Sequence, residues 1–277
     1  MKSLFFCIFF SLITMTGSAQ EPVNKCASEL SIYEQNMKSL SVSLAGIGVI
    51  TAWGVLKWDY FSQAPHAGSE GWFANTTEEG GADKLGHLYT SYAVSRGLSS
   101  LYENWCFTKD NAALYGSLSS FAIMGYMEFG DSFSEYGFSY EDMISNFLGC
   151  TAGYLLHKNP DLASKFDLRW EYGFEPDDAD FSTDYENSKY LLALKFNGFE
   201  TINKTFLKHF ELHMGYYVRG FSDDEVKKER NIYFGIGLNL TDLFRRYSWK
   251  KTATLLNYIQ IPGTYLQYKH GFSVTGF

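Results

Sequence analysis

The chain has 277 residues, of which 45% are hydrophobic and 18% aromatic, and its formal net charge is -8. The apolar content is enough for a packed core and excludes a globally disordered chain, because disordered chains are poor in hydrophobic residues. The acidic balance argues against a nucleic-acid-binding protein, which needs a surface rich in Lys and Arg.

The first 19 residues have the features of a secretory signal peptide. Lys2 gives the positive start, Leu4 to Met15 form a short apolar stretch, and Gly17-Ser18-Ala19 are small residues of the kind that signal peptidase prefers. We expect cleavage after Ala19 rather than retention as an anchor, because the apolar stretch is shorter than the roughly 20 residues that a span needs. The sequence therefore predicts an exported protein, periplasmic and associated with the outer membrane or another membrane.

Three cysteines remain after the predicted cleavage, namely Cys26, Cys106 and Cys150. Export permits disulfides, but an odd number allows at most one bridge within the chain, and the sequence does not choose the pair. Val23-Asn24-Lys25 before Cys26 is not the small, apolar context of a lipoprotein signal. We therefore expect no lipid on Cys26.

Four stretches rich in Gly, Ala and Ser are predicted as helices, at residues 39–56, 83–103, 111–128 and 141–157. Small residues let helix backbones approach closely, in water or in lipid. The first helix carries no charge but is interrupted by three glycines, so none of the four has a convincing length for a membrane span. We expect a compact bundle that lies on a membrane or partly within it.

After Pro160 the side-chain pattern changes to a period of two, which is typical of strands with one buried face. Five strands are predicted, at residues 166–172, 190–199, 210–219, 232–240 and after Pro262-Gly263. The terminal Phe277 suggests an outer-membrane barrel as a less favoured alternative, since closed bacterial barrels have at least about eight strands.

The predicted fold class is therefore α+β. A four-helix-bundle-like part at residues 28–160 follows the signal peptide at 1–19, and an antiparallel β-rich region at 161–277 packs on the helices.

Two predicted helices concentrate polar side chains in apolar surroundings. Asp83 and His87 are four residues apart and share one helix face, as do Asp142 and Asn146, while Glu128 ends seventeen uncharged residues.

Each of these residues also has a purely structural interpretation. Asp83 is suited to capping its helix, Ser139 and Asp142 have the spacing of a capping box, and a lone histidine such as His87 is commonly structural. Asn146 is the exception, because asparagine is unfavourable inside a helix and must find hydrogen-bond partners if it is buried.

The order of these motifs resembles that of a known family. Asp83-Lys84-x-x-His87, then Glu128, then Ser139 before Asp142-x-x-x-Asn146, is similar to the pattern of the YfiM-like family of predicted periplasmic (lipo)proteins of unknown function. This resemblance runs from Trp72 to the C-terminus. A more distant similarity to VanZ-like helical domains covers residues 83–156, with Asp131 standing where those domains have Gln. The resemblance implies an envelope location and a VanZ-like helical part, and it implies no reaction.

If the second and fourth helices pack side by side, five side chains meet in a shielded pocket, namely Asp83, His87, Glu128, Asp142 and Asn146. We treat all five as candidate catalytic residues. Asp83, His87, Glu128 and Asp142 are also candidate ligands of a divalent metal ion, because imidazole and carboxylate groups bind Zn, Mn and Fe. Crowded carboxylates would alternatively act as acids or bases, or simply fix the helix packing.

The sequence favours an exported cell-envelope protein with a membrane-associated binding or maintenance role and an acidic-histidine pocket. Its expected partner is a membrane surface or an envelope lipid, and not a nucleic acid. One alternative is a metal-assisted or acid–base hydrolase that acts on an envelope lipid or glycan. The other is a structural, partner-binding protein without an active site, so enzymatic activity stays open.

Overall fold

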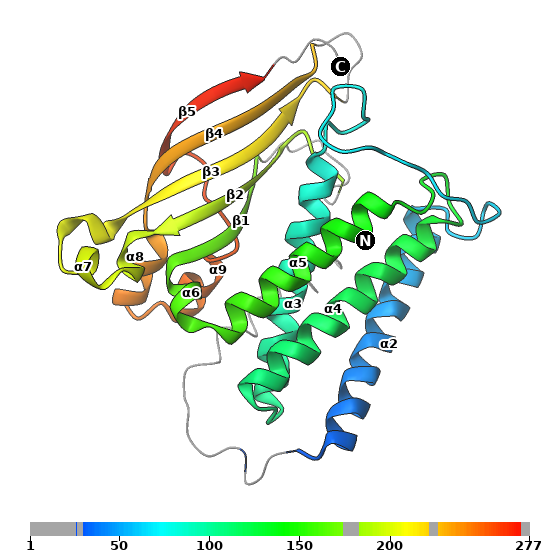
Figure 1. Cartoon of the computed structure of the whole chain (residues 1–277), viewed down its shortest axis with the longest axis horizontal. Helices are drawn as coiled ribbons and strands as arrows, with labels where there is room; N and C mark the ends of the chain where they lie inside the picture. Colours follow the sequence, from blue (N-terminus) through cyan, green and yellow to red (C-terminus); the bar gives the residue numbers. More distant parts are fainter. Residues whose placement is uncertain (1–25, 27–29, 174–182, 222–226, 273–277) are drawn as a thin grey trace.

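The computed structural model describes Cys26 and residues 30–173, 183–221 and 227–272. Within these residues a group of helices is followed by a five-stranded antiparallel sheet (Figure 1), which confirms the predicted α+β class. The predicted signal peptide and its cleavage site lie outside the described residues.

Four long helices form the first part of the chain, namely α2 (Ile32–Lys57), α3 (Ala82–Asn104), α4 (Lys109–Asp131) and α5 (Tyr140–Lys158). The start of α2 is the main correction: Ser31 and Glu34 form a capping box, so the helix begins at Ile32 rather than near Ser39. With 26 residues, α2 is long and apolar enough to cross a membrane by length and composition. The expectation that no helix reaches that length was therefore wrong.

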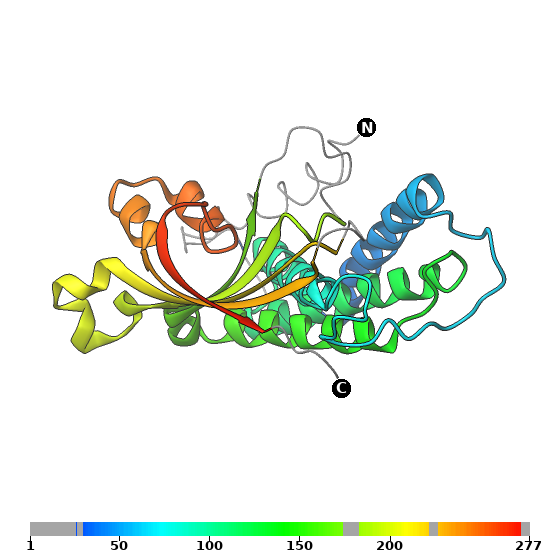
Figure 2. The same cartoon turned by 90° about the horizontal axis from the view of Figure 1, so that it is seen from above.

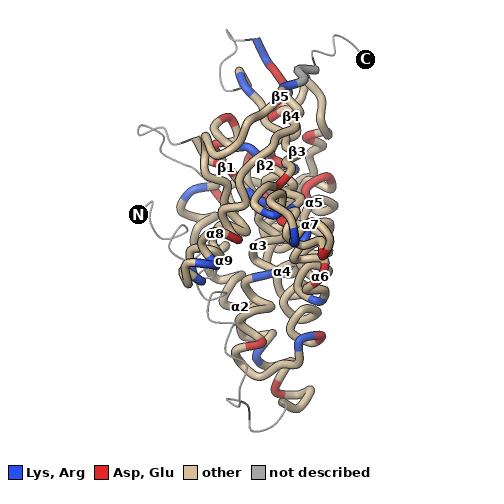
Figure 3. The backbone as a smooth tube through the Cα atoms, turned by 90° about the vertical axis from the view of Figure 1, so that its left-hand side faces the viewer, with Lys and Arg blue, Asp and Glu red and all other residues tan. Residues whose placement is uncertain are grey.

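Helices α3, α4 and α5 pack against one another through small residues, and α2 lies against α4 at the edge (Figure 1). The Oγ atoms of Ser95 and Ser117 are 2.7 Å apart between α3 and α4. A Cβ at Gly149 of α5 would overlap the backbone carbonyl of Leu88 in α3. Charged side chains are sparse along α2 and α4 (Figure 3), as the uncharged runs in the sequence require.

The sheet contains β1 (Phe166–Tyr172), β2 (Ser188–Lys195), β3 (Phe210–Arg219), β4 (Glu229–Leu238) and β5 (Tyr265–Phe272), paired in chain order. The predicted second strand ends early, because the chain turns at the 3-10 helix η2 (Phe196–Gly198). Short helices not predicted from the sequence connect the strands, namely α6 (Pro160–Lys165), α7 (Glu200–Asn203), η3 (Phe206–His209), α8 (Leu240–Arg246) and α9 (Lys250–Leu255).

The concave face of the curved sheet holds α8 and α9 (Figure 2) and buries charged side chains. Arg169 of β1 donates to Asp167 and Glu211, and His213 lies 2.8 Å from Glu211. Each buried ion is therefore paired, as a buried charge must be.

The convex face of the sheet is apolar. It meets α3 along β1 and β2, where Tyr89, Tyr92 and Tyr258 pack with Trp170 and Tyr190. This contact positions the sheet beside the N-terminal half of α3.

The disulfide pairing that the sequence left open is between Cys26 and Cys106. Cys150 is a buried free thiol, and burial raises its pKa to about 11. The bridge attaches the chain before α2 to the residue that follows the end of α3.

Candidate functional site

Helix α3 starts from two glycines with left-handed backbone, Gly80 (φ 58°) and Gly81 (φ 85°). A Cβ at Gly81 would also overlap the ring of Phe73, so both the backbone and the packing favour glycine here. This start places Asp83 in the first turn of α3 and His87 one turn later on the same face.

His87 lies between carboxylates from two other helices. Its Nδ1 is 3.1 Å from Oε1 of Glu128 at the end of α4, and its Nε2 is 3.9 Å from Oδ1 of Asp142 in α5. Each of the three residues offers one ligand atom, and these atoms all lie within 4.8 Å of one another. Glu128 and Asp142 are 1% and 3% exposed, so the cluster is shielded from bulk water.

A second cluster surrounds the buried side chain of Lys84. Its Nζ contacts Glu70, lies 2.6 Å from Asp83 and lies 2.9 Å from Asp142. The four metal ligands predicted from the sequence therefore divide into two sets: Asp83 belongs to the carboxylates around Lys84, while His87, Glu128 and Asp142 form the other set. Asp142 connects them.

Asn146 stands behind the cluster rather than in it. Its Nδ2 donates to Oε1 of Glu128 at 3.3 Å, and its Oδ1 accepts a 2.7 Å hydrogen bond from Ser91. Asn146 is fully buried and does not line the adjoining cavity. In this geometry it orients Glu128 instead of facing a ligand.

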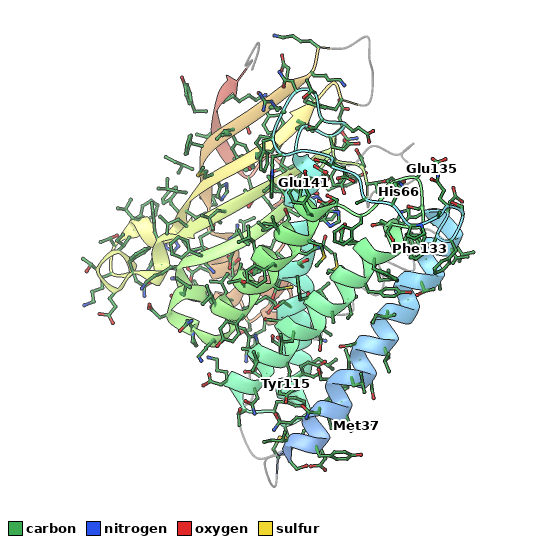
Figure 4. The ribbon with its side chains drawn as sticks, turned by 45° about the vertical axis from the view of Figure 1, so that its right-hand side comes forward. Met37, His66, Tyr115, Phe133, Glu135 and Glu141 are labelled. Carbon is green, nitrogen blue, oxygen red and sulfur yellow. A yellow bond between two sulfur atoms is a disulfide. The ribbon has the colours of Figure 1, made fainter. Side chains whose placement is uncertain are left out.

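The clusters line one side of a cavity of about 380 Å³. Its charged lining is acidic apart from His87, and its seven carboxyl residues are Glu70, Glu78, Glu79, Asp83, Glu128, Asp131 and Asp142. Aromatic side chains also line the cavity, namely Trp58, Tyr89, Tyr136, Trp170, Tyr185 and Tyr190. Figure 4 shows this end of the helices around the labelled Glu141 and His66, with Tyr115 and Met37 at the opposite end.

The electrostatics of the cavity follow from burial and from crowded charges. Burial alone would lower the pKa of His87, but Glu128 and Asp142 outweigh it and raise the pKa to about 10. Burial favours the neutral form of Asp142, yet the charges of His87 and Lys84 lower its pKa below the ordinary value.

Three other carboxyl groups of the cavity titrate near neutral pH. Burial, together with the charge of Glu128, raises the pKa of Asp131 to about 7. Burial and neighbouring carboxylates also raise the pKa of Glu79 to about 7 and that of Glu70 to about 8. The folded chain thus holds protons here that an open chain would release.

Sequence reasoning missed several residues of the cavity. Glu70 and Glu79 lie in the connection before α3, where no periodic pattern marks them. Glu141, which does not line the cavity, was also missed: it is fully buried, and it accepts hydrogen bonds from Ser69 Oγ (2.8 Å) and from the backbone N–H of Gly71 (3.1 Å). Its place beside the N-cap Ser139, which accepts from the N–H of Asp142, was the one available signal.

A search of curated proteins and a search of solved structures found no match to this chain. A family model described as predicted periplasmic lipoprotein (DUF2279) matches residues 69–158. In this chain Cys26 is bonded to Cys106, so its sulfur is not free to carry a lipid. The more specific resemblance to the YfiM-like family and to VanZ-like domains stays a prediction. The matched segment contains His87, Glu128, Asp142 and Asn146, and its family supports an exported envelope protein of unknown function.

Proposed function

We propose that this is an exported, membrane-associated envelope protein that binds a divalent metal ion in its acidic-histidine pocket. The observation that carries the proposal is the convergence of His87, Glu128 and Asp142 from three helices, with their ligand atoms within 4.8 Å of one another. One imidazole and two carboxylates are a normal ligand set for Zn, Mn or Fe.

The charge of the pocket supports a cation as its ligand. The lining carries seven carboxyl groups against His87, and the buried Lys84 beside it contacts three of them, namely Glu70, Asp83 and Asp142. Because Glu128 and Asp142 raise the pKa of His87 to about 10, a proton occupies this histidine at neutral pH. A metal ion must displace that proton, so we expect metal affinity to increase with pH.

The membrane-associated part of the proposal is supported by two findings. Helix α2 has the length and composition of a membrane span, and only 11% of its most apolar 18-residue stretch is buried. The family model that matches residues 69–158 is described as predicted periplasmic lipoprotein, which supports a location in the cell envelope beside a membrane. We propose a membrane surface or an envelope lipid as the partner.

The metal proposal is tested by titrating the purified, detergent-solubilised chain with Zn²⁺ and with Mn²⁺ in a calorimeter. We expect one site in the wild type and a loss of affinity of about tenfold or more in His87→Ala and Glu128→Gln. His157→Ala is the matched control, because His157 lies 3.2 Å from Glu103 and the described residues give this pair no third ligand.

A wild type that binds neither ion, or a control that loses as much affinity as His87→Ala, contradicts the proposal. If the wild type binds no metal and the site variants have a lower melting temperature than the wild type, the cluster is a structural network.

A hydrolase is the second candidate, and one observation favours it. Three protein ligands beside an open cavity of about 380 Å³ leave room for water and a substrate, as catalytic metal sites do. Asp131, which lines the same cavity, would serve as the acid or base. Asp131→Asn would then abolish hydrolysis of envelope lipid or glycan extracts and leave metal affinity unchanged, whereas an unchanged rate would exclude this role.

A further inference from the structure

The sheet has its polar face inside and its apolar face outside. Two rows of side chains cross it in register on the convex face. One row contains Leu168, Leu192, Met214, Phe234 and Tyr268, and the other contains Phe166, Leu194, Leu212, Ile236 and Leu266. Neither row contains a charged residue, while Asp167, Arg169 and Glu211 are buried on the concave face.

Helix α3 contacts the sheet at β1, at β2 and at one end of β3, where Ala82 packs against Tyr216 and Val218. Beyond it, Met214, Phe234 and Ile236 are 52%, 53% and 55% exposed. An antiparallel sheet in water normally turns its polar face outward, so this sheet is arranged for an apolar surrounding on its convex side.

Helices α4 and α5 extend the same surface. Exposed apolar residues recur one turn apart along α5, at Ile144, Phe147 and Leu148. On α4, the exposed Leu114 and Leu118 are also one turn apart. The rings of Phe121 and Phe147 are 6.0 Å apart, so the two stripes meet. Figure 2 shows α4 and α5 on the same side of the molecule as the convex face, opposite α8 and α9. We call this combined surface the outer apolar face.

A hollow of about 630 Å³ lies in the outer apolar face where α3 meets the sheet. Most of the side chains that line it are apolar, among them Leu85, Leu88, Leu192 and Met214, while Arg169 and Arg230 are the charged residues of the lining. Water in such a hollow would find few hydrogen-bond partners, whereas flexible hydrocarbon chains can fill an irregular space.

We infer that the outer apolar face lies against the hydrocarbon of a lipid bilayer. Two observations favour lipid over a second copy of the chain: α2, packed on α4, has the composition of a membrane span, and the hollow would have to be matched by a protrusion on a rigid partner. The inference rests on the membrane part of the proposed function and is independent of the metal. The outer apolar face then meets the membrane, and the concave face of the sheet lies outside the bilayer.

The test places an environment-sensitive fluorophore at single positions of the full chain, in vesicles of phosphatidylethanolamine and phosphatidylglycerol. Ile236→Cys and Phe147→Cys carry the label on the outer apolar face. Leu243→Cys is the matched control, since Leu243 is 41% exposed and belongs to α8, a helix that lies on the other side of the sheet (Figure 2). The wild type, whose free Cys150 is buried, measures background labelling.

We expect vesicles to shift the emission to the blue and raise it several-fold at positions 236 and 147, with no change at 243. An unchanged emission at position 236 in protein that floats with the vesicles overturns the inference. A blue shift of the emission at position 236 that appears without vesicles when the protein concentration is raised also overturns the inference. It would identify a second copy of the chain as the occupant of this face. The calorimetric test is made in detergent, so failure of metal binding leaves these outcomes unaffected.

Discussion

Asn146 shows how a single amide holds the candidate site together. It is fully buried, accepts from Ser91 of α3 and donates to Glu128 of α4. Its position inside a predicted helix was enough to predict that it needs partners, because a buried amide without them is costly. The identity of those partners could not be predicted, since it depends on how α3, α4 and α5 cross.

Asn146→Ala tests this role. The variant removes one buried hydrogen bond from Ser91 and one from Glu128, so we expect it to lower the free energy of unfolding by about 1–3 kcal/mol. Metal affinity should fall as well, because Glu128 loses the bond that orients it. Urea denaturation and calorimetry measure the two effects.

Asn159→Ala is the control for this substitution. Asn159 is exposed at the end of α5, and its side chain bonds only to the carbonyl of Leu155 among the described hydrogen bonds, so loss of that side chain should cost less than about 0.5 kcal/mol. Equal effects of the two variants would show that Asn146 has no special role.

At the scale of the elements, the contact between α3 and α5 depends on backbones that nearly touch. The sequence predicted close helix contacts from the small residues of these stretches, and it predicted α3 and α5 to within one residue at each end. It missed the start of α2, because the Ser31–Glu34 capping box precedes the apolar run that marked the helix. It also extended β2 past Lys195, where side-chain alternation continues into a turn.

Gly149→Ala tests the close contact, because the added Cβ would overlap the backbone carbonyl of Leu88. Backbone cannot move aside as a side chain can, so we expect a loss of about 1–3 kcal/mol in unfolding free energy. Gly48→Ala in α2 is the matched control: nothing lies within 4 Å of its Cβ, and alanine should stabilise the helix by about 0.5–1 kcal/mol. Thermal unfolding of both variants measures the difference, and a shift of the same sign in both would contradict this account.

At the scale of the whole molecule, the main surprise is which face of the sheet points outward. The period of two in the sequence predicted five strands, and the structure confirms them. A period of two assigns side chains to two faces of the sheet but does not indicate which face is buried. It therefore could not predict that the charged face is the buried one. That choice depends on α8, α9 and the ion pairs around Arg169, which join residues from distant parts of the chain.

The stability of the whole chain should depend on pH in one direction between about pH 4 and pH 8. Glu70, Glu79 and Asp131 have pKa values of about 8, 7 and 7 in the folded chain, above their ordinary values of 4.5, 4.5 and 3.8. The folded state therefore holds more protons than the unfolded state in this window, and its stability falls as the pH rises. The raised pKa of His87 acts in the same direction: its contribution is complete below 6.5 and is lost as the pH rises through about 10.

We therefore expect a lower melting temperature at pH 8 than at pH 5, measured with a metal chelator present. Asp131→Asn, which imitates the protonated acid, should reduce this difference. Asp161→Asn is the control, because its carboxylate is 82% exposed. A melting temperature that rises over the same window would contradict the assigned protonation states.

The disulfide between Cys26 and Cys106 has a consequence for the reach of the molecule. Cys106 follows the last residues of α3, whereas Asp83 and His87 lie in its first turns. A helix rises about 1.5 Å per residue, so His87 and Cys106, which are 19 residues apart in the chain, are separated by roughly 30 Å. The disulfide therefore ties the chain before α2 to the end of α3 that is remote from the acidic cavity, and a pull on Cys26 would load that remote end first.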